Sequence, residues 1–206
     1  MTAQIQTAID GLGQDFPQGA AQKLGVLMDE LQRWNKKVNL TAIRDRGEII
    51  RSHLLDSLVA APLLQGETIL DVGTGAGFPG LPLAIVHPEL QFTLLDSNNK
   101  KVMFAQHVAG LLGLDNVSTV KARGEDYAPG HGFDTVIARA LAALSRLVEI
   151  AGHHVGEGGV FIALKGRYPA TEVEQLEKPW RHAVTELNVP GLEKGSRHAV
   201  LLRRQP

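Results

Sequence analysis

The chain has 206 residues, which suits one domain with a modest extension and allows a fully buried core. Its hydrophobic fraction of 44% is ordinary for a globular protein, and the absence of cysteine excludes a disulfide framework and a thiolate metal site. The formal net charge of −1 does not by itself indicate a protein that binds nucleic acid.

The first third of the chain has the pattern of helices. Apolar residues recur at the three- and four-residue spacing of one buried helix face in two segments, residues 18–34 and 47–64. No convincing strand pattern accompanies them. We therefore expect an N-terminal helical cap over residues 1–65, followed by one compact domain over residues 66–206.

In the remainder, short apolar strands alternate with helical segments. Seven strands are expected, at Thr68–Val72, Gln91–Asp96, Val117–Lys121, Phe133–Ala138, Gly159–Leu164, Trp180–Leu187 and His198–Arg203. Helices are expected at Leu81–Val86, Lys100–Leu112, Leu141–His153 and residues 170–178. This alternation predicts an α/β fold whose parallel sheet has helices on both faces. The last two strands predict an antiparallel hairpin at one edge, which makes the seven-stranded sheet mixed.

A glycine-rich turn follows the first expected strand. The run that begins at Asp71 reads DVGTGAGFPG and stands between a strand and a helix, which is the context of a nucleotide-binding turn. Gly73, Gly75 and Gly77 permit positive φ and a close approach of the backbone to a ligand. A dinucleotide fingerprint would need glycine where Phe78 stands, and the Gly-Lys-Ser/Thr of a phosphate loop is absent.

An acidic residue ends the second expected strand. Asp96 can accept charge-assisted hydrogen bonds from the two hydroxyls of a ribose. The alternative is that the glycines only make a tight turn and that Asp96 caps the next helix at Asn98. Because the turn and the carboxylate stand at consecutive strand ends, the pair favours a cofactor site.

Six runs, in order along the chain, carry a family resemblance. They are Asn39–Thr41, His53–Leu58, Asp71–Ile85, Leu94–Lys101, Phe133–Ala140 and Ala163–Gly166. Together they resemble the RsmG (GidB) family, and the glycine turn resembles motif I of class I methyltransferases. The chain departs from the family at Asn98, where members often have leucine, and at Gly124, where they often have a larger residue.

The resemblance implies a class I methyltransferase (Rossmann-like) fold with the helical extension at its N-terminus. It implies S-adenosyl-L-methionine as cofactor and N7 of a guanine in 16S ribosomal RNA, at the decoding region, as methyl acceptor. Gly73 and Phe78 would line the cofactor, and Gly124 with Glu125 would hold its adenine end. The complete predicted cofactor set is Asp71, Gly73, Gly75, Gly77, Phe78, Asp96, Ser97, Gly124, Glu125 and Arg139.

Arg139, at the end of the fourth expected strand, is the predicted catalytic residue by the same resemblance. Guanine N7 has a free lone pair and needs no general base, so catalysis requires only alignment of N7 with the methyl group. The base must be unpaired or flipped out to be reached. Arg139 could hydrogen-bond guanine O6 or a flanking phosphate, or it could bond only the cofactor or an acid in the loop. Both alternatives stay open.

His53 and Asp56 lie three residues apart on one expected helix face, and with Asn39 they form a polar group among apolar neighbours. The favoured interpretation is a buried hydrogen-bonded joint between the helical cap and the sheet. The alternative is a contact with RNA or a brace for the cofactor loop. No metal site is expected, because His153 and His154 have no second cluster of ligands beside them.

Local basic clusters suggest where RNA would bind. They comprise Arg33, Lys36, Lys37, Arg44, Arg46 and Arg51 near the N-terminus, Lys100, Lys101, Lys121 and Arg123 near the sheet, and Lys194, Arg197, Arg203 and Arg204 in the tail. Each cluster alone is more often a solvated face, whereas Lys165 ends the fifth strand, where the ligand crevice of such folds lies. We predict RNA contacts by Lys100, Arg123, Lys165 and Arg197.

The near-neutral charge predicts poor binding of naked RNA, so the expected substrate is the small ribosomal subunit or its precursor. A cytoplasmic monomer without signal peptide or membrane segment is expected. Two other functions are compatible with the motifs, a methyltransferase for a small molecule or protein and a non-catalytic regulator that binds the cofactor. A nicotinamide oxidoreductase is disfavoured by Phe78.

Overall fold

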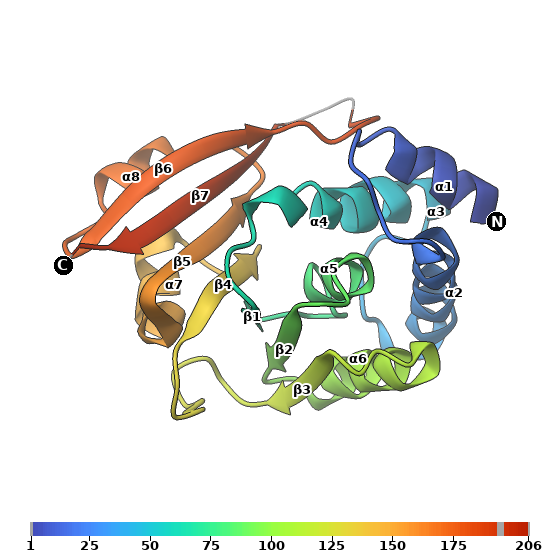
Figure 1. Ribbon diagram of the computed structural model, residues 1–206, viewed down its shortest axis with the longest axis horizontal. Coiled ribbons are helices and arrows are strands. Elements are labelled where there is room, and N and C mark those ends of the chain that lie inside the picture. Colours follow the sequence, from blue (N-terminus) through green and yellow to red (C-terminus); the bar gives the residue numbers. More distant parts are fainter. Residues whose placement is uncertain (1, 193–195, 206) are drawn as a thin grey trace.

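The computed structural model describes residues 2–192 and 196–205 and contains one central sheet (Figure 1). Its strand order is β3-β2-β1-β4-β5-β7-β6. The strands are β1 Thr68–Val72, β2 Gln91–Asp96, β3 Val117–Lys121, β4 Phe133–Arg139, β5 Val155–Lys165, β6 Trp180–Leu187 and β7 Arg197–Arg204. Strands β1 to β5 pair in parallel, and β7 is antiparallel to both β5 and β6. The expected mixed sheet with a hairpin at one edge is confirmed.

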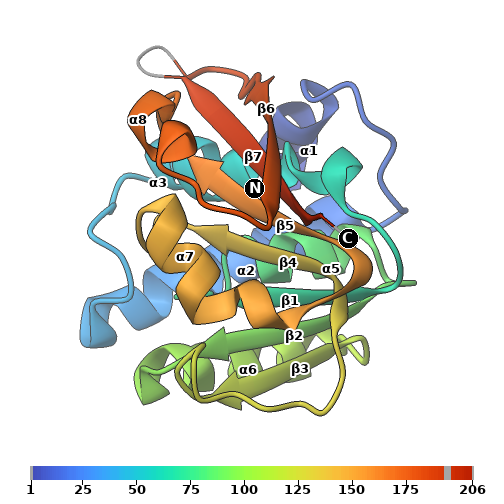
Figure 2. The same ribbon diagram turned by 90° about the vertical axis from the view of Figure 1, so that its left-hand side faces the viewer.

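Helices cover both faces of the sheet. They are α1 Thr2–Asp10, α2 Ala20–Val38, α3 Arg46–Ile49, α4 Asp56–Leu58, α5 Gly80–Val86, α6 Asn99–Leu112, α7 Leu144–Ala151 and α8 Ala170–Glu174. Helices α1 to α6 pack into one apolar cluster, and α7 and α8 pack into a second. In Figure 2, α7 lies in front of the central strands and α5 behind them. None of the helices in the described part of the chain has the length and hydropathy needed to cross a bilayer.

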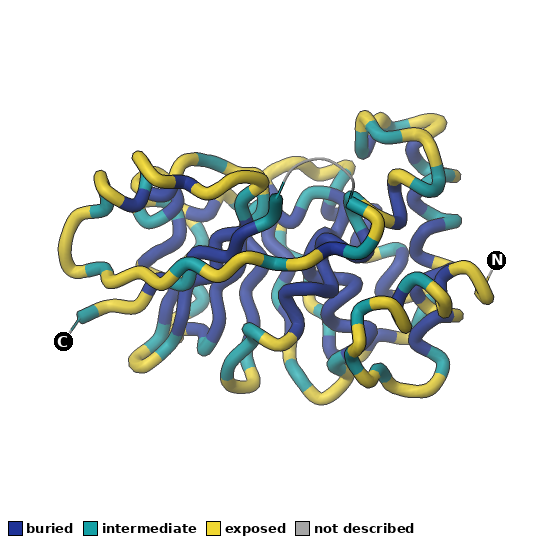
Figure 3. Tube along the Cα trace, turned by 90° about the horizontal axis from the view of Figure 1, so that it is seen from above, coloured by how far each residue is buried: buried dark blue, intermediate teal, exposed yellow. Residues whose placement is uncertain are grey.

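The two periodicities of the sequence explain this layering. In β1, Ile69 belongs to the first cluster whereas its neighbours Leu70 and Val72 belong to the second, since side chains alternate across a strand. In α2, the stripe that contains Leu24 and Leu31 is fully buried. Figure 3 shows the buried trace running through the middle of the molecule, with exposed residues concentrated in the connections. The first cluster contains residues from both sides of residue 65, and a domain boundary there stays a prediction.

Three expected elements differ from the structure. The helix expected at 47–64 is divided, because a π-helical segment at Ile50–Leu55 joins α3 to α4 and a short 3-10 turn follows at Ala61–Leu63. The helix expected at 141–153 begins only at Leu144, after Ala140 adopts a left-handed φ of 51°. Strand β5 begins at Val155 rather than Gly159, with a register shift opposite Phe133 and Thr135.

Smaller differences complete the comparison. Helix α1 was not singled out within the helical cap, and α8 ends at Glu174 rather than at residue 178. Lys194, part of the predicted basic tail, lies outside the described residues.

Candidate active site

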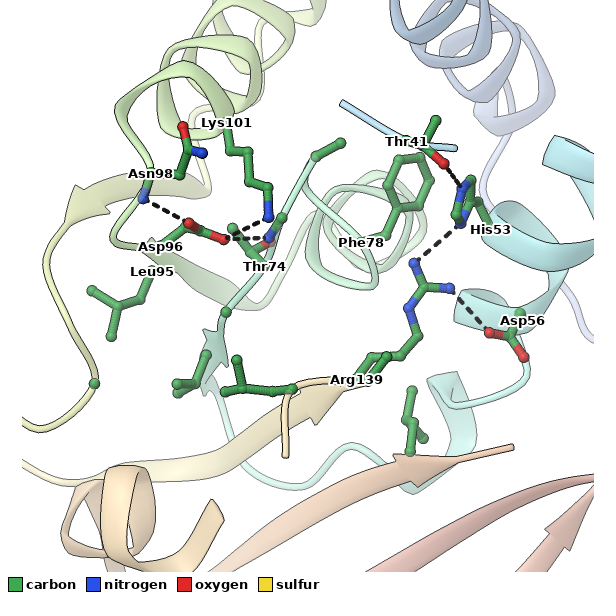
Figure 4. A pocket seen from close by; sticks show the side chains of 18 of the residues that line it. Thr41, His53, Asp56, Thr74, Phe78, Leu95, Asp96, Asn98, Lys101 and Arg139 are labelled. Carbon is green, nitrogen blue, oxygen red and sulfur yellow. Dashed lines mark hydrogen bonds and ion pairs between the residues drawn. The ribbon is translucent and has the colours of Figure 1, made fainter. Parts of the chain in front are cut away.

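A cavity of about 990 Å³ opens at the carboxyl ends of β1, β2, β4 and β5 (Figure 4). This volume is at the upper end of the roughly 300–1,000 Å³ typical of small-molecule sites. One wall comes from the glycine turn and the strand ends, and the opposite wall comes from the helical cap, through residues such as Thr41 and His53. The cavity therefore has space for a cofactor beside a second ligand.

The glycine turn and Asp96 meet in this cavity. The Gly75 N–H donates to Asp96 Oδ2 at 2.9 Å, and the Asn98 N–H donates to Asp96 Oδ1 at 2.8 Å. Gly73 and Gly75 have φ values of 69° and 62°, in the left-handed region that glycine adopts readily. A carboxylate offers about four acceptor positions, so two of them remain for further donors. Asp96 thus holds the turn and can still accept bonds from a ligand.

The alternative role of Asp96, as the cap of the next helix, is present only as one hydrogen bond to the residue before that helix. Asp96 accepts the Asn98 N–H, but the side chain of Asn98 caps α6 by accepting the Lys100 N–H at 3.0 Å. Lys101, which the predicted site omits, lines the cavity with its Nζ 3.9 Å from Asp96 Oδ2.

Two of the predicted cofactor residues lie outside the cavity lining. Asp71 is fully buried beneath the turn, where its Oδ2 accepts hydrogen bonds from Thr74 Oγ1 at 2.6 Å and from the Gly80 N–H at 2.8 Å. Burial raises the pKa of Asp71 to about 6. Gly77 has a φ of 79°, and a Cβ there would lie 2.3 Å from Leu81 Cδ1. Both residues shape the turn from behind.

The predicted adenine end lies beyond Asp96, where Ser97, Gly124 and Glu125 line the cavity. A Cβ on Gly124 would lie 2.4 Å from Ile150 Cγ2, so any side chain at this position would require Ile150 to move. The Gly124 carbonyl accepts a hydrogen bond from His154 Nε2 at 2.8 Å. Glu125 Oε1 accepts one from Arg146 Nη2 at 3.2 Å.

Arg139 crosses from the sheet to the helical cap. Its Nη1 donates to Asp56 Oδ2 at 3.0 Å (Figure 4). The same nitrogen donates to the Ser52 carbonyl at 3.1 Å. Its Nη2 lies 3.4 Å from His53 Nδ1. Asp56 also accepts a hydrogen bond from Arg197 Nε on β7. One carboxylate therefore joins the cap to two strands.

His53 completes this group as a neutral ring. Burial and the charge of Arg139 lower the pKa of His53 to about 4. Its Nε2 lies 2.8 Å from Thr41 Oγ1, and its ring centroid lies 5.3 Å from that of Phe78. The joint between cap and sheet that we favoured from the sequence is present for His53 and Asp56. Asn39 instead ends α2 with a φ of 50°.

The four predicted RNA-binding residues have different surroundings. Lys165 Nζ donates to Glu172 Oε2 and to the Ala142 carbonyl, both at 2.8 Å, so it braces the loop after β4. Arg197 also lines the cavity and is paired with Asp56. Arg123 is exposed at the cavity wall, and Lys100 is exposed on α6 outside it. Direct RNA contacts by these residues stay a prediction.

The comparisons with known proteins agree with this geometry. The family model for GidB, rRNA small subunit methyltransferase G, matches residues 20–200. A ribosomal RNA small subunit methyltransferase G from Alkalilimnicola ehrlichii is 47% identical over 195 residues, which cover 94% of this chain and 88% of the relative. One from Aeromonas salmonicida is 50% identical over 173 residues, covering 84% and 83%.

Solved structures of methyltransferases share the fold at low sequence identity. A ribosomal protein L11 methylase from Lactobacillus delbrueckii has a TM-score of 0.57 and 21% identity, covering 74% of this chain and 77% of its own. A tRNA (uracil-54, C5)-methyltransferase from Pyrococcus abyssi, in complex with S-adenosyl-L-homocysteine, has a TM-score of 0.54 and 23% identity, covering 71% and 37%. The fold is that of class I methyltransferases, and the chain belongs to the rRNA small subunit methyltransferase G (GidB) family.

Proposed function

We propose that this chain transfers a methyl group from S-adenosylmethionine to N7 of a guanine in 16S ribosomal RNA. The observation that carries the proposal is the direct bond between the Gly75 N–H and Asp96, inside a cavity that also contains Arg139. A regulator that only binds the cofactor would not need the second half of this cavity. Family membership supports the substrate class.

The residues present fit S-adenosylmethionine. Two acceptor positions on Asp96 remain for the ribose hydroxyls, and the left-handed glycines bring bare backbone to the cavity wall. Ser97, Gly124 and Glu125 lie on the side where the adenine would be held. Phe78 lies on the opposite side, next to Arg139. The distance from Arg139 Cζ to the centre of the Phe78 ring is 5.7 Å. We assign the methionine end of the cofactor to the space between Gly73 and Phe78.

When bound, the cofactor supplies an electrophilic methyl group on a sulfonium sulfur. The protein's task is to orient the guanine so that N7 faces that methyl group in line, without removing a proton. Arg139 is suited to orient the acceptor, because its Nη1 is held by Asp56 and Ser52 while its Nε–H has no hydrogen-bond partner among the described residues. We assign Arg139 the task of donating to guanine O6, which leaves the N7 lone pair free.

The charge distribution favours an assembled substrate. Arg139, Lys165 and Arg197 are all paired with acidic side chains, so few cations beside the cavity remain for phosphates. We therefore propose that the substrate is the assembled small subunit or its precursor. We also propose that the enzyme acts in the cytoplasm and as a monomer. A methyltransferase for a small apolar molecule would be expected to have a cavity free of such ion pairs.

The direct test compares 16S ribosomal RNA from cells with and without the gene, using mass spectrometry of nuclease fragments. We expect one guanine to lose a methyl group at N7 when the gene is deleted and to regain it when the purified protein acts on the mutant subunits. An identical methylation pattern in the two strains would refute the proposed substrate. Loss of the methyl group in an Asp96→Ala strain, with a folded protein present, would link it to this cavity.

A further inference from the structure

An exposed aromatic ring lies beside the cavity mouth. Tyr168 belongs to the loop between β5 and α8 and is 55% exposed, although aromatic side chains usually bury most of their surface. Lys165 and Gly166, at the start of this loop, line the cavity. The ring therefore lies in the immediate neighbourhood of the proposed active site without being needed for the core.

The partner of this ring is a buried histidine that faces the cavity. The rings of Tyr168 and His198 are 5.6 Å apart and meet edge to face at 77°. His198, on β7, lines the cavity and is only 9% exposed. Its Nδ1 is buried and has no hydrogen-bond partner among the described residues. This nitrogen is shielded from solvent, so His198 contributes to the cavity mouth through its ring, against which the edge of Tyr168 packs.

Positive charge accompanies the pair. Arg167, next to Tyr168, is exposed and has no acidic partner in the described part of the chain. Arg197, next to His198, approaches the same loop, with its Nη1 3.9 Å from the position of a Cβ on Gly166, but its charge is paired with Asp56. An aromatic face beside an unpaired cation, as in Tyr168 and Arg167, is a combination that binds unpaired nucleotides, whose bases stack and whose phosphates are negative.

We propose that Tyr168 and His198 form a second nucleotide subsite, which holds an unpaired base adjacent to the target guanine. Tyr168 stacks on this base, His198 holds the Tyr168 ring in place by its edge-to-face contact, and Arg167 contacts the phosphate of the base. The subsite rests on the proposed function, because it requires that RNA enters the cavity. The cations Arg139, Lys165 and Arg197 of the cavity wall are paired with carboxylates, so the wall offers few charges for binding the RNA. The subsite explains how the RNA is still held: the flanking base anchors the strand outside the cavity while the guanine enters it.

The test compares Tyr168→Leu with Tyr168→Phe, which keeps an aromatic face. Leu111→Ala is the matched control, because Leu111 is 53% exposed on α6 and does not line the cavity. With small subunits that lack the methyl group, we expect Tyr168→Leu to raise both KM and the dissociation constant for subunits by about 10-fold, within the roughly 5- to 160-fold that one stacked base contributes. Tyr168→Phe and Leu111→Ala should stay within about 2-fold of wild type. The affinity for S-adenosylmethionine should be the same in all variants.

A photo-crosslinking side chain placed at position 168 identifies the occupant. Crosslinks to a 16S nucleotide next to the methylated guanine support the subsite. Crosslinks only to a ribosomal protein, or a wild-type KM in Tyr168→Leu, overturn it. If the protein with the crosslinking side chain crosslinks to ribosomal RNA but the wild-type protein methylates no guanine, the proposed function fails instead, so the two failures are distinguishable.

Discussion

At the scale of single residues, Asp56 has the most consequential position outside the cofactor loop. Its carboxylate lies between Arg139 of β4 and Arg197 of β7, and all three side chains are largely buried. Arg197 is 141 positions away in sequence. A carboxylate that neutralises two arginines is difficult to replace, because its loss leaves two like charges close together in a region of low dielectric constant.

We therefore expect Asp56→Asn to lower the free energy of unfolding by about 3 kcal/mol, the low end of what breaking a buried ion pair costs. Urea denaturation measures it. Glu149→Gln is the matched acid-to-amide control, since Glu149 pairs with Arg146 on the exposed side of α7, and it should not measurably change stability. If both variants unfold at the same urea concentration, the Asp56 group does not stabilise the fold.

His53 predicts a pH dependence of stability. Its pKa is about 4 in the folded chain against an ordinary value of 6.5, so between these values the unfolded chain binds a proton that the folded chain excludes. The contribution of His53 to stability is therefore complete above about pH 6.5 and declines as the pH falls toward 4. Asp71 acts in the opposite direction, because its raised pKa makes the folded chain bind more protons between 3.8 and about 6.

Comparison of wild type with His53→Gln separates the contribution of His53 to the pH dependence of stability from that of Asp71, because Asp71 is present in both proteins. The stability difference in favour of wild type should be larger at pH 7.5 than at pH 5, as measured by urea unfolding at the two values. A difference that is constant with pH would mean that His53 titrates alike in the folded and unfolded chains.

At the scale of elements, the sequence predicted what depends on local pattern. The bounds of β1, β2, β3 and β6 agree with the structure, because turn-forming residues flank each of these short runs. The start of β5 was missed, since the run GEGG at residues 156–159 has the composition of a turn but lies inside the strand. The π-helical segment at 50–55 was missed as well, because its apolar pattern differs little from that of an α-helix.

Site features that depend on local sequence pattern could be predicted, whereas those that depend on packing between distant segments could not. The proximity of the glycine turn to Asp96 could be predicted, because both stand at the carboxyl ends of neighbouring strands, whereas their direct hydrogen bond is a finding of the structure. The pairing of Asp56 with Arg139 and Arg197 depends on how the helical cap packs against the sheet, which no local pattern shows. Likewise, the buried position of Asp71 follows from its contacts with Thr74 and Gly80 rather than from its place in the motif.

The glycine turn provides a matched pair of variants. Gly75 and Gly77 both have positive φ, so alanine at either position costs roughly 1 kcal/mol of stability in backbone strain. Only at Gly77 would the new Cβ also overlap Leu81, whereas Gly75 faces open space in the cavity wall. We expect Gly77→Ala to be the less stable variant in urea denaturation. Gly75→Ala should have the larger loss of S-adenosylmethionine affinity in calorimetry, and the opposite ranking would place the cofactor elsewhere.

At the scale of the whole molecule, a net charge of −1 is combined with a cavity whose cations are mostly paired. Of the basic residues that line the cavity, Arg123 has no carboxylate partner among the described residues, and Lys101 Nζ comes only within 3.9 Å of Asp96 Oδ2. Arg167, next to the lining residue Gly166, is exposed and has no acidic partner in the described part of the chain. A binding surface with so few available charges must depend on shape and stacking as well as on phosphate contacts. This distinguishes it from proteins that bind nucleic acid through a broad basic face.

The salt dependence of subunit binding measures this directly. Each neutralised phosphate contributes about −0.7 to −0.9 to the slope of log K against log salt concentration, so about three contacts predict a slope near −2 to −3. Arg123→Gln should make the slope shallower by about 1. Arg203→Gln is the control, because Arg203 bonds Gln65 and the Gly158 carbonyl at the opposite end of the sheet, and it should leave the slope unchanged. A wild-type slope steeper than about −6 would require a basic surface well beyond the cavity mouth, and the flanking-base subsite would then be a minor part of binding.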